Sequence, residues 1–200
     1  MVHCNFKKVE HIKGENLNLQ YYDNFFDINE SKIYFSKLEN DILWREENII
    51  VWGKKIMTKR KIALYGDTNK SYTYSRLTVY PDKWNNVLLS IKEKIENIIS
   101  IKFNSVLCNN YPDGKVGMGW HSDDEKELGR NPIIASVSFG AERDFFLKHK
   151  KNKNLKQKTI NIKNGSLLLM LGSTQHYWKH SIPIRKKIKD RRINLTFRRI

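Results

Sequence analysis

Residues 103–111, FNSVLCNNY, begin the part of the chain that decides the fold. They are the first of six short strand-type runs, which glycines and polar turns separate. The other five are IIASVSF (133–139), RDFFLKH (143–149), KTINIK (158–163), SLLLML (166–171) and RINLTFR (192–198). A series of short strands of this kind predicts a β-sandwich or barrel, with jelly rolls among the candidates.

Two amphipathic segments precede these strands. In residues 29–44, Phe35, Leu38 and Ile42 recur at spacings of three and four, and DINE just ahead resembles a capping box. A clearer apolar stripe runs through residues 84–100. We therefore expect an α+β protein, in which an N-terminal α/β elaboration packs on a C-terminal β core without a linker between independent domains.

The composition favours a folded, nucleic-acid-binding protein. The 200 residues include 37 Lys and Arg against 21 Asp and Glu, a formal net charge of +16. Such an excess favours a polyanionic partner, most often nucleic acid. Hydrophobic residues make up 40% and aromatic residues 12% of the chain, which argues against disorder.

The cysteines and the N-terminus favour an intracellular, soluble protein. Cys4 and Cys108 indicate no disulfide framework, so we expect two reduced thiols. The N-terminal MVHCNFKKVEHIK has no apolar signal region. The longest apolar run, Leu167 to Leu171, is far too short to cross a bilayer.

His121 and Asp123 lie two residues apart in GWHSDDE (119–125), a spacing that lets both side chains of an extended segment reach one metal ion. A second histidine would complete the 2-His-1-carboxylate set of non-haem Fe(II) oxygenases. His149 lies in a lysine-rich run and is interpreted as solvated. The third ligand is then His176 or His180, both in TQHYWKHSIP (174–183).

The C-terminal run RINLTFR has one apolar and one polar face. If it is a strand, its polar face carries Arg192, Asn194, Thr196 and Arg198. Two guanidinium groups flanking two neutral donors can cradle a dicarboxylate, because each guanidinium can bind a carboxylate bidentately. A dicarboxylate beside a facial triad points to 2-oxoglutarate as co-substrate.

With these residues in view, the chain resembles the AlkB family of Fe(II)/2-oxoglutarate dioxygenases, and most closely its eukaryotic-type DNA-repair members. The resemblance runs from about Trp52 to Ile200. It rests on NNYPDGKVGMGWHSDDE (109–125), PIIASVSFGAERDF (132–145), HSIPIRKK (180–187) and RINLTFR, in family order. It implies a double-stranded β-helix (jelly-roll) core over about 103–200, a nucleotide-recognition lid over about 46–82, and a dioxygenase domain, 46–200, after an N-terminal extension with a helix, 1–45.

The resemblance also implies the metal and co-substrate residues. His180 is preferred to His176 because it opens the HSIP motif, so Fe(II) would be held by His121, Asp123 and His180. Arg192 would bind the far carboxylate of 2-oxoglutarate and Arg198 would lie nearer the metal. The rest of the co-substrate pocket would comprise Asn109, Tyr111, Asn194 and Thr196.

The implied substrate contacts divide into three groups. Glu125 would face the target base, beside lid residues Tyr72, Thr73 and Tyr74. A finger of Trp52, Gly53 and Lys54 would fill the gap that a flipped base leaves. The basic triplet Arg185, Lys186 and Lys187 would bind the nucleic-acid backbone.

The implied reaction is oxidative demethylation of N1-methyladenine and N3-methylcytosine in DNA. It would use Fe(II), O2 and 2-oxoglutarate and would release formaldehyde, succinate and CO2. Duplex DNA is favoured by the finger and the basic triplet, with single-stranded DNA or RNA as the alternative. A non-catalytic nucleic-acid-binding module on the same fold is the alternative from another class. We expect a monomer that does not bind membranes, located in the nucleus if the source is a cellular eukaryote.

Overall fold

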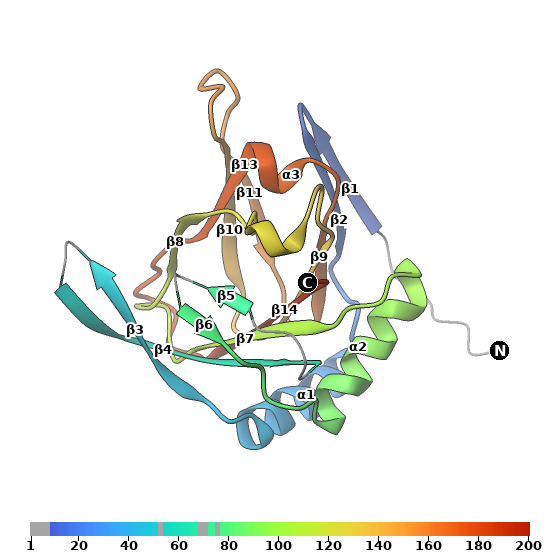
Figure 1. Ribbon diagram of the computed structural model, residues 1–200, viewed down its shortest axis with the longest axis vertical. Helices are drawn as coiled ribbons and strands as arrows, with labels where there is room; N and C mark the ends of the chain where they lie inside the picture. The colour runs from blue at the N-terminus through green and yellow to red at the C-terminus, as the bar shows by residue number, and fades with distance from the viewer. Residues whose placement is uncertain (1–8, 52–53, 68–71, 75–76) are drawn as a thin grey trace.

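The structure is a computed structural model that describes residues 9–51, 54–67, 72–74 and 77–200. Two β-sheets face one another, and two helices cover the outside of the larger sheet (Figure 1). This arrangement matches the jelly-roll expectation.

The larger sheet has, among the described residues, eight antiparallel strands in the order β1-β2-β12-β9-β14-β7-β4-β3. Their bounds are β1 Val9–Gly14, β2 Leu17–Tyr22, β3 Arg45–Val51, β4 Lys54–Gly66, β7 Ser105–Tyr111, β9 Ile134–Gly140, β12 Ser166–Met170 and β14 Arg192–Arg198.

The smaller sheet, within the same described ranges, has the strand order β11-β10-β13-β8. These strands are β8 Met118–His121, β10 Arg143–His149, β11 Lys158–Ile162 and β13 Trp178–Ile182. A separate hairpin pairs β5 (Tyr72–Tyr74) with β6 (Leu77–Val79). Short helical turns η1 (Lys126–Leu128) and α3 (Thr174–Tyr177) complete the set.

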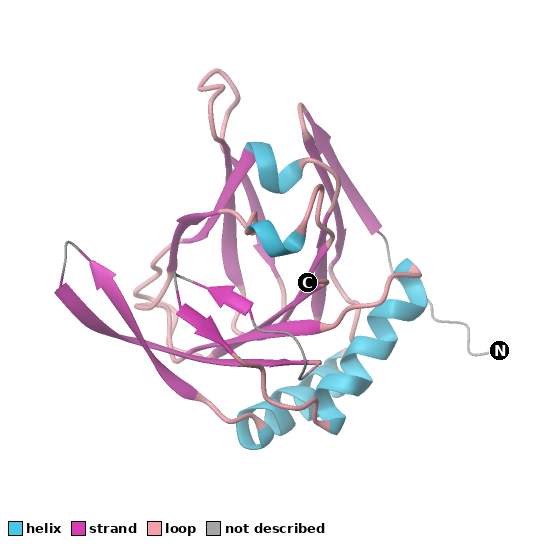
Figure 2. Ribbon diagram, in the orientation of Figure 1, coloured by secondary structure: helices cyan, strands magenta, loops and turns pink. Residues whose placement is uncertain are grey.

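The core has two layers because the strands of the larger sheet are buried on both faces. Leu167 and Leu169 of β12 face helices α1 (Ile28–Asp41) and α2 (Asn86–Ile99), which lie together against the sheet (Figure 2). Leu168 and Met170 instead pack between the two sheets. Burial of both faces explains why SLLLML reads as a continuous apolar run.

The six strand-type runs predicted from the sequence all form strands, β7, β9, β10, β11, β12 and β14. The sequence did not single out β1, β2 or β13. In β2 and β12, Tyr22 pairs with Leu167, so the sheet crosses the division predicted at residue 45. Similarly β4 pairs with β7, which joins part of the predicted lid region to the core sheet. The division into 1–45 and 46–200 stays a prediction.

Helix α1 confirms the capping box but ends earlier than predicted. The Asp27 side chain accepts from the backbone of Glu30, and the Glu30 side chain accepts from the backbone of Asp27. The prediction that helix continues to residue 44 was wrong, because Ile42 is already extended. There the Asn85 side chain donates to the Asp41 carbonyl, so the cap of α2 satisfies the end of α1.

Candidate metal and co-substrate site

Two histidines meet between the sheets because their strands are neighbours. His121 ends β8 and pairs in register with His180 of β13. Since residues directly opposite in adjacent antiparallel strands point to the same side, the two imidazole rings lie 4.2 Å apart between centroids. His180 is buried, and it also stacks on Phe145 of β10 with a centroid distance of 5.1 Å.

Asp123 completes the cluster from just beyond the end of β8. Its carboxylate Oδ2 lies 3.7 Å from Nε2 of His180, and ligand atoms of His121, Asp123 and His180 all lie within 4.8 Å of one another. Arg198 donates to the Asp123 carboxylate at 2.5 Å. The backbone amide of Asp123 donates to the Gln175 side chain at 3.0 Å, so both ends of the residue are held.

The electrostatics suit a dication. Burial alone would raise the pKa of Asp123, but Arg198, His180 and His121 outweigh it and lower that pKa. Burial, followed by His121, lowers the pKa of His180 to about 3. The carboxylate is therefore ionised and the imidazole neutral at physiological pH, which are the forms that bind a metal ion.

A hydrogen bond orients His121. Its Nδ1 lies 2.9 Å from the carbonyl oxygen of Gly119. Because a carbonyl can only accept, Nδ1 carries the hydrogen and Nε2 keeps the lone pair that a metal ion requires. This donor set fits Fe(II), which the 2-His-1-carboxylate arrangement selects.

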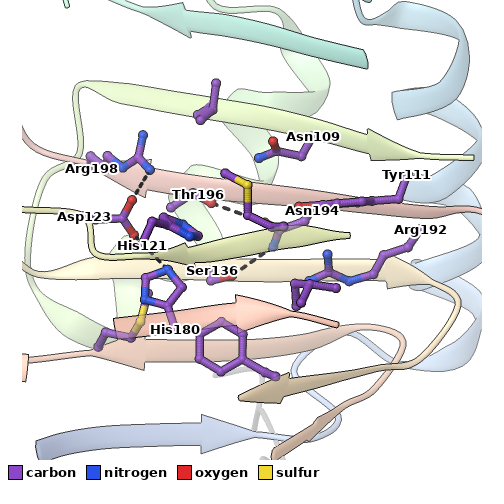
Figure 3. Close-up of a pocket in the computed structure, with 15 residues that line it drawn as sticks. Asn109, Tyr111, His121, Asp123, Ser136, His180, Arg192, Asn194, Thr196 and Arg198 are labelled. Atoms are coloured by element: carbon purple, nitrogen blue, oxygen red, sulfur yellow. Dashed lines mark hydrogen bonds and ion pairs between the residues drawn. The ribbon is translucent and has the colours of Figure 1, made fainter. Parts of the chain in front are cut away.

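A pocket extends from the three ligand residues along β7 and β14 (Figure 3). Figure 3 shows Arg198 beside Asp123, whereas Arg192 lies at the other end of the pocket. The sequence-predicted co-substrate residues all line this pocket, and they are Asn109, Tyr111, Arg192, Asn194, Thr196 and Arg198.

Arg192 is a buried cation with unused donors. Its Nη2 donates to Ser138 Oγ at 2.9 Å and its guanidinium lies over the Tyr111 ring at 5.2 Å, but Nε and Nη1 have no hydrogen-bond partner among the described residues. Burial lowers the pKa of Arg192 to about 10 although Tyr111 opposes the shift, so the group stays charged at pH 7. A buried guanidinium with two nitrogens that lack a hydrogen-bond partner fits one carboxylate of a dicarboxylate.

The neutral residues of the pocket already form hydrogen bonds with one another and with their neighbours. Asn194 donates to Ser136 Oγ at 2.9 Å and to the Val137 carbonyl at 2.8 Å, and Thr196 donates to Asn194 at 3.3 Å. Asn109 keeps a buried side-chain oxygen without a partner in the described structure. The pocket thus offers both charged and neutral groups to a ligand.

Comparison with known proteins agrees with this site. A sequence profile described as the 2OG-Fe(II) oxygenase superfamily matches residues 18–198. DNA oxidative demethylase ALKBH2 of Bos taurus is 39% identical over 198 residues, covering 94% of this chain and 71% of the relative. Alpha-ketoglutarate-dependent dioxygenase alkB homolog 3 of Homo sapiens is 38% identical over 187 residues, covering 90% and 65%.

The chain belongs to the AlkB family of 2OG-Fe(II) oxygenases. It is a dioxygenase whose co-substrates are 2-oxoglutarate and O2 and whose metal is Fe(II). The solved structure of OsALKBH1 superimposes with a TM-score of 0.68 at 14% identity, over 96% of this chain and 100% of that one. At this identity the match shows the jelly-roll fold alone.

The AlkB-like substrate residues are described only in part. Trp52 and Gly53 lie outside the described residues, Lys54 begins β4, and the run from Tyr72 to Tyr74 forms β5. Glu125 lies just before η1 and has a buried Oε2 without a partner among the described residues.

The three residues of the basic triplet of this AlkB-family chain differ in whether a carboxylate neutralises their charge. Arg185 forms a salt bridge with Asp144 at 2.6 Å. Lys186 and Lys187 are exposed and have no carboxylate partner in the part of the chain that the structure describes. The two lysines are therefore unneutralised charges of this loop, as is the exposed Lys189 in the described structure.

Sequence reasoning missed residues that act through packing. Gln175 is 1% exposed, and no local pattern marks it because its partner Asp123 is 52 residues away. The interpretation of His149 as solvated was wrong, since it packs on Trp178 at 5.4 Å and accepts from the amide of Asn152. His176 is exposed and accepts from the Asn131 amide, away from the ligand cluster.

No helix in the described ranges combines the length and apolar character needed to span a membrane.

Cys108 is a buried free thiol, and burial raises its pKa, so it stays protonated and unreactive.

Proposed function

We propose that this protein is a DNA oxidative demethylase that acts on N1-methyladenine and N3-methylcytosine. Membership of the AlkB family supports the reaction type, and relatives named DNA oxidative demethylase support the substrate class. The formal net charge of +16 supports a polyanionic substrate.

The observation that carries the proposal is one pocket with two different ends. At one end lie His121, Asp123 and His180, and at the other lies the partly unpaired guanidinium of Arg192. A ligand that chelates a metal ion through one end and presents a carboxylate at the other matches both. 2-Oxoglutarate has this chemistry, and Arg192 would hold its far carboxylate.

Bound Fe(II) together with 2-oxoglutarate supplies the activation of O2 that oxidises the N-methyl group, with release of formaldehyde, succinate and CO2. The chain itself positions the reactants and excludes water. His121, Asp123 and His180 would hold the metal, and Arg198 orients the Asp123 carboxylate by its hydrogen bond. Apolar side chains, including Phe145, form part of the pocket wall beside the polar groups.

Glu125 would recognise the methylated base. Its Oε2 is buried and has no hydrogen-bond partner among the described residues, so it can accept a hydrogen bond from the base. N1-methyladenine and N3-methylcytosine are cationic, so a carboxylate at this position favours them over the neutral bases. The aromatic residues of β5, Tyr72 and Tyr74, are proposed to stack on the extruded base.

Duplex DNA is the proposed substrate form, and a single strand is the alternative. The proposal rests on Lys186 and Lys187 as backbone contacts and on Trp52, Gly53 and Lys54 as the finger. Arg185 would contribute to the backbone contact only if its bond to Asp144 opened. We further propose a monomer that needs no membrane and that is nuclear if the source is a eukaryotic cell.

The test is release of formaldehyde and succinate from a duplex oligonucleotide carrying one N1-methyladenine, with Fe(II), ascorbate and 2-oxoglutarate present and a chelator control. Chelator-sensitive release supports the proposal. Release from the matched single strand alone moves the substrate to the single-stranded class. The absence of release from both, with 2-oxoglutarate still bound, refutes the substrate assignment.

Loss of a metal ligand gives the first specific prediction. His121→Ala and Asp123→Ala should abolish turnover while the affinity for DNA stays within about threefold, because phosphate contacts dominate that affinity. Turnover assays paired with fluorescence anisotropy on the same oligonucleotide measure both quantities. Turnover by either variant at the wild-type rate would contradict the ligand assignment, and the non-catalytic alternative predicts no turnover by the wild type.

A further inference from the structure

The outer face of the smaller sheet carries an aromatic pair that the proposed reaction does not use. Trp120 of β8 and Phe146 of β10 point away from the metal site, because their neighbours His121 and Phe145 line the pocket. The two rings are stacked, with centroids 6.5 Å apart and an angle of 26° between their planes.

A small residue lets the two rings meet across an intervening strand. Strand β13 lies between β10 and β8, and its Ser181 pairs directly with Phe146. A larger side chain at this position would stand between the rings. Trp120, Phe146 and Ser181 therefore line a groove, together with Gln157 and the half-exposed Ile184, which is 55% exposed.

A cation lies over the face of each ring. The Lys148 ammonium lies 4.2 Å from the Trp120 ring centroid, and the Arg185 guanidinium lies 5.3 Å from that of Phe146. The charge of Arg185 is balanced by Asp144. Lys148 has no carboxylate partner among the residues that the structure describes, so its charge is available to an anion.

A second lysine increases this uncompensated charge. Lys148 of β10 pairs directly with Lys179 of β13, and both side chains are exposed. Like charges directly opposite one another in a sheet are destabilising. The pair therefore leaves two uncompensated cations on this face, where an anion would relieve their repulsion.

The groove and the metal pocket share two lining residues. Met118 and Ile182 line both hollows, and they face one another across β8 and β13. Because β8 is the edge strand of the sheet, a nucleic-acid strand that inserts one base into the pocket can pass over this edge to the groove.

We propose that this groove stacks an unpaired base of the substrate strand on Trp120 and Phe146, while Lys148 moves off the Trp120 ring and, with Lys179, binds the phosphates of that strand. Aromatic rings with flanking cations and no fixed hydrogen-bonding pattern are how proteins bind single strands without sequence preference. The inference rests on the proposed function and deepens it, because it assigns unpaired nucleotides beside the extruded base to the substrate. A fully paired duplex must open further to occupy the groove.

The test is the affinity for a short unmodified oligothymidylate, measured by fluorescence anisotropy over a range of salt concentrations. Trp120→Ala should weaken binding about 10- to 100-fold without changing the salt dependence. Trp120→Phe, which keeps a ring, should restore most of the affinity. Lys148→Ala and Lys179→Ala should each reduce the slope of log K against log salt by about 0.7.

Trp44→Ala is the matched control, since Trp44 is a partly buried tryptophan that packs on the helical side of the larger sheet. It should leave the affinity unchanged. An affinity of Trp120→Ala within twofold of the wild type overturns the proposal. Equal losses on the single strand and on a blunt duplex also overturn it, because they place backbone rather than a base over the rings.

If Trp120→Ala does not fold, the difference in tryptophan emission between the wild type and Trp120→Phe reports on Trp120 directly. Oligothymidylate should quench this difference signal, and an unchanged signal overturns the stacking. Because the oligonucleotide carries no methyl group, this result is independent of turnover. Failure of the demethylation assay would refute the proposed function while the groove could still be shown to bind.

Discussion

The chain satisfies the buried guanidinium of Arg192 only in part. Arg192 is 2% exposed, and two of its nitrogens have no hydrogen-bond partner among the described residues. An unpaired buried charge costs several kcal/mol in a folded protein (about 3–5 kcal/mol when a partner is removed). Binding of an anion at this position therefore stabilises the fold as well as the complex.

Arg192→Met should preserve or raise the stability of the free protein but weaken its binding of 2-oxoglutarate. Without 2-oxoglutarate the variant should be as stable as the wild type or more stable, because an unpaired charge is removed. Its affinity for 2-oxoglutarate should fall at least about 100-fold, since two charge-assisted hydrogen bonds are lost. Thermal unfolding with Mn(II), with and without 2-oxoglutarate, measures both effects.

Arg143→Met is the matched control for this experiment. Arg143 is also buried, but its guanidinium donates to the carbonyls of Pro183 at 2.7 Å and Val116 at 3.0 Å. Its loss should lower stability. If Arg192→Met is destabilised as much as Arg143→Met and still binds 2-oxoglutarate, the assignment of Arg192 is wrong.

Gln175 is predicted to position Asp123, whose carboxylate would bind the metal ion. Its Oε1 accepts the buried amide of Asp123, and its Nε2 donates to Met170 Sδ at 3.2 Å. Gln175→Leu should weaken Mn(II) binding about 10- to 100-fold, as changes next to metal ligands do, whereas Gln175→Glu keeps the acceptor and should bind nearly as the wild type. Titration calorimetry under anaerobic conditions measures this, and normal Mn(II) binding by Gln175→Leu would contradict it.

Among the elements, helix α2 is fixed to the segment that leads into β7 by a buried carboxylate near its C-terminus. Glu96 accepts from the backbone amide of Phe103 at 2.7 Å and from Lys92 and Lys102, each at 2.9 Å. Burial would raise its pKa, but the hydrogen bonds from Lys92, Lys102 and Phe103 outweigh burial and lower it. The ionised form is thus the one that the fold prefers.

This lowered pKa predicts how stability depends on pH. A depressed carboxyl pKa stabilises the fold above the ordinary glutamate value of about 4.3, and the contribution is lost as the pH falls through the folded pKa. Glu96→Gln should cost about 2 kcal/mol at neutral pH, and the difference from the wild type should shrink in acid. Urea unfolding across this range measures it, with the exposed Glu93→Gln as control. A difference that does not depend on pH would exclude this role of Glu96.

At the scale of the whole molecule, the net charge of +16 makes binding to DNA depend on salt. The exposed Lys186 and Lys187 follow the HSIP segment, so they lie close to the metal ligand His180 in the chain. Each should contribute one phosphate contact to a duplex.

Lys186→Ala and Lys187→Ala should therefore each lower the slope of log K against log salt by about 0.9 on duplex DNA. Lys37→Ala removes the same charge from α1, on the far side of the larger sheet, and should leave the slope unchanged. Anisotropy titrations at several salt concentrations distinguish the three variants. Equal effects of all three would mean that only the overall charge, rather than this loop, binds DNA.

Sequence periodicity and short motifs determined the elements and the ligand types of this protein. The six strand-type runs, the capping box at Asp27 and the H-x-D spacing at His121 depend on local backbone preferences, so they can be read from neighbouring residues. The alternation of RINLTFR likewise predicted a polar face, which lines the pocket in the structure.

Only the tertiary structure decided which distant residues meet. From the residues alone His176 and His180 were equal candidates, and pairing of β13 with β8 places His180 opposite His121 while His176 stays exposed. Contacts such as Arg198 with Asp123, 75 residues apart, follow from the strand order of two facing sheets. The strand order cannot be read from local sequence, because the register of long-range strand pairs depends on how whole sheets bury their faces.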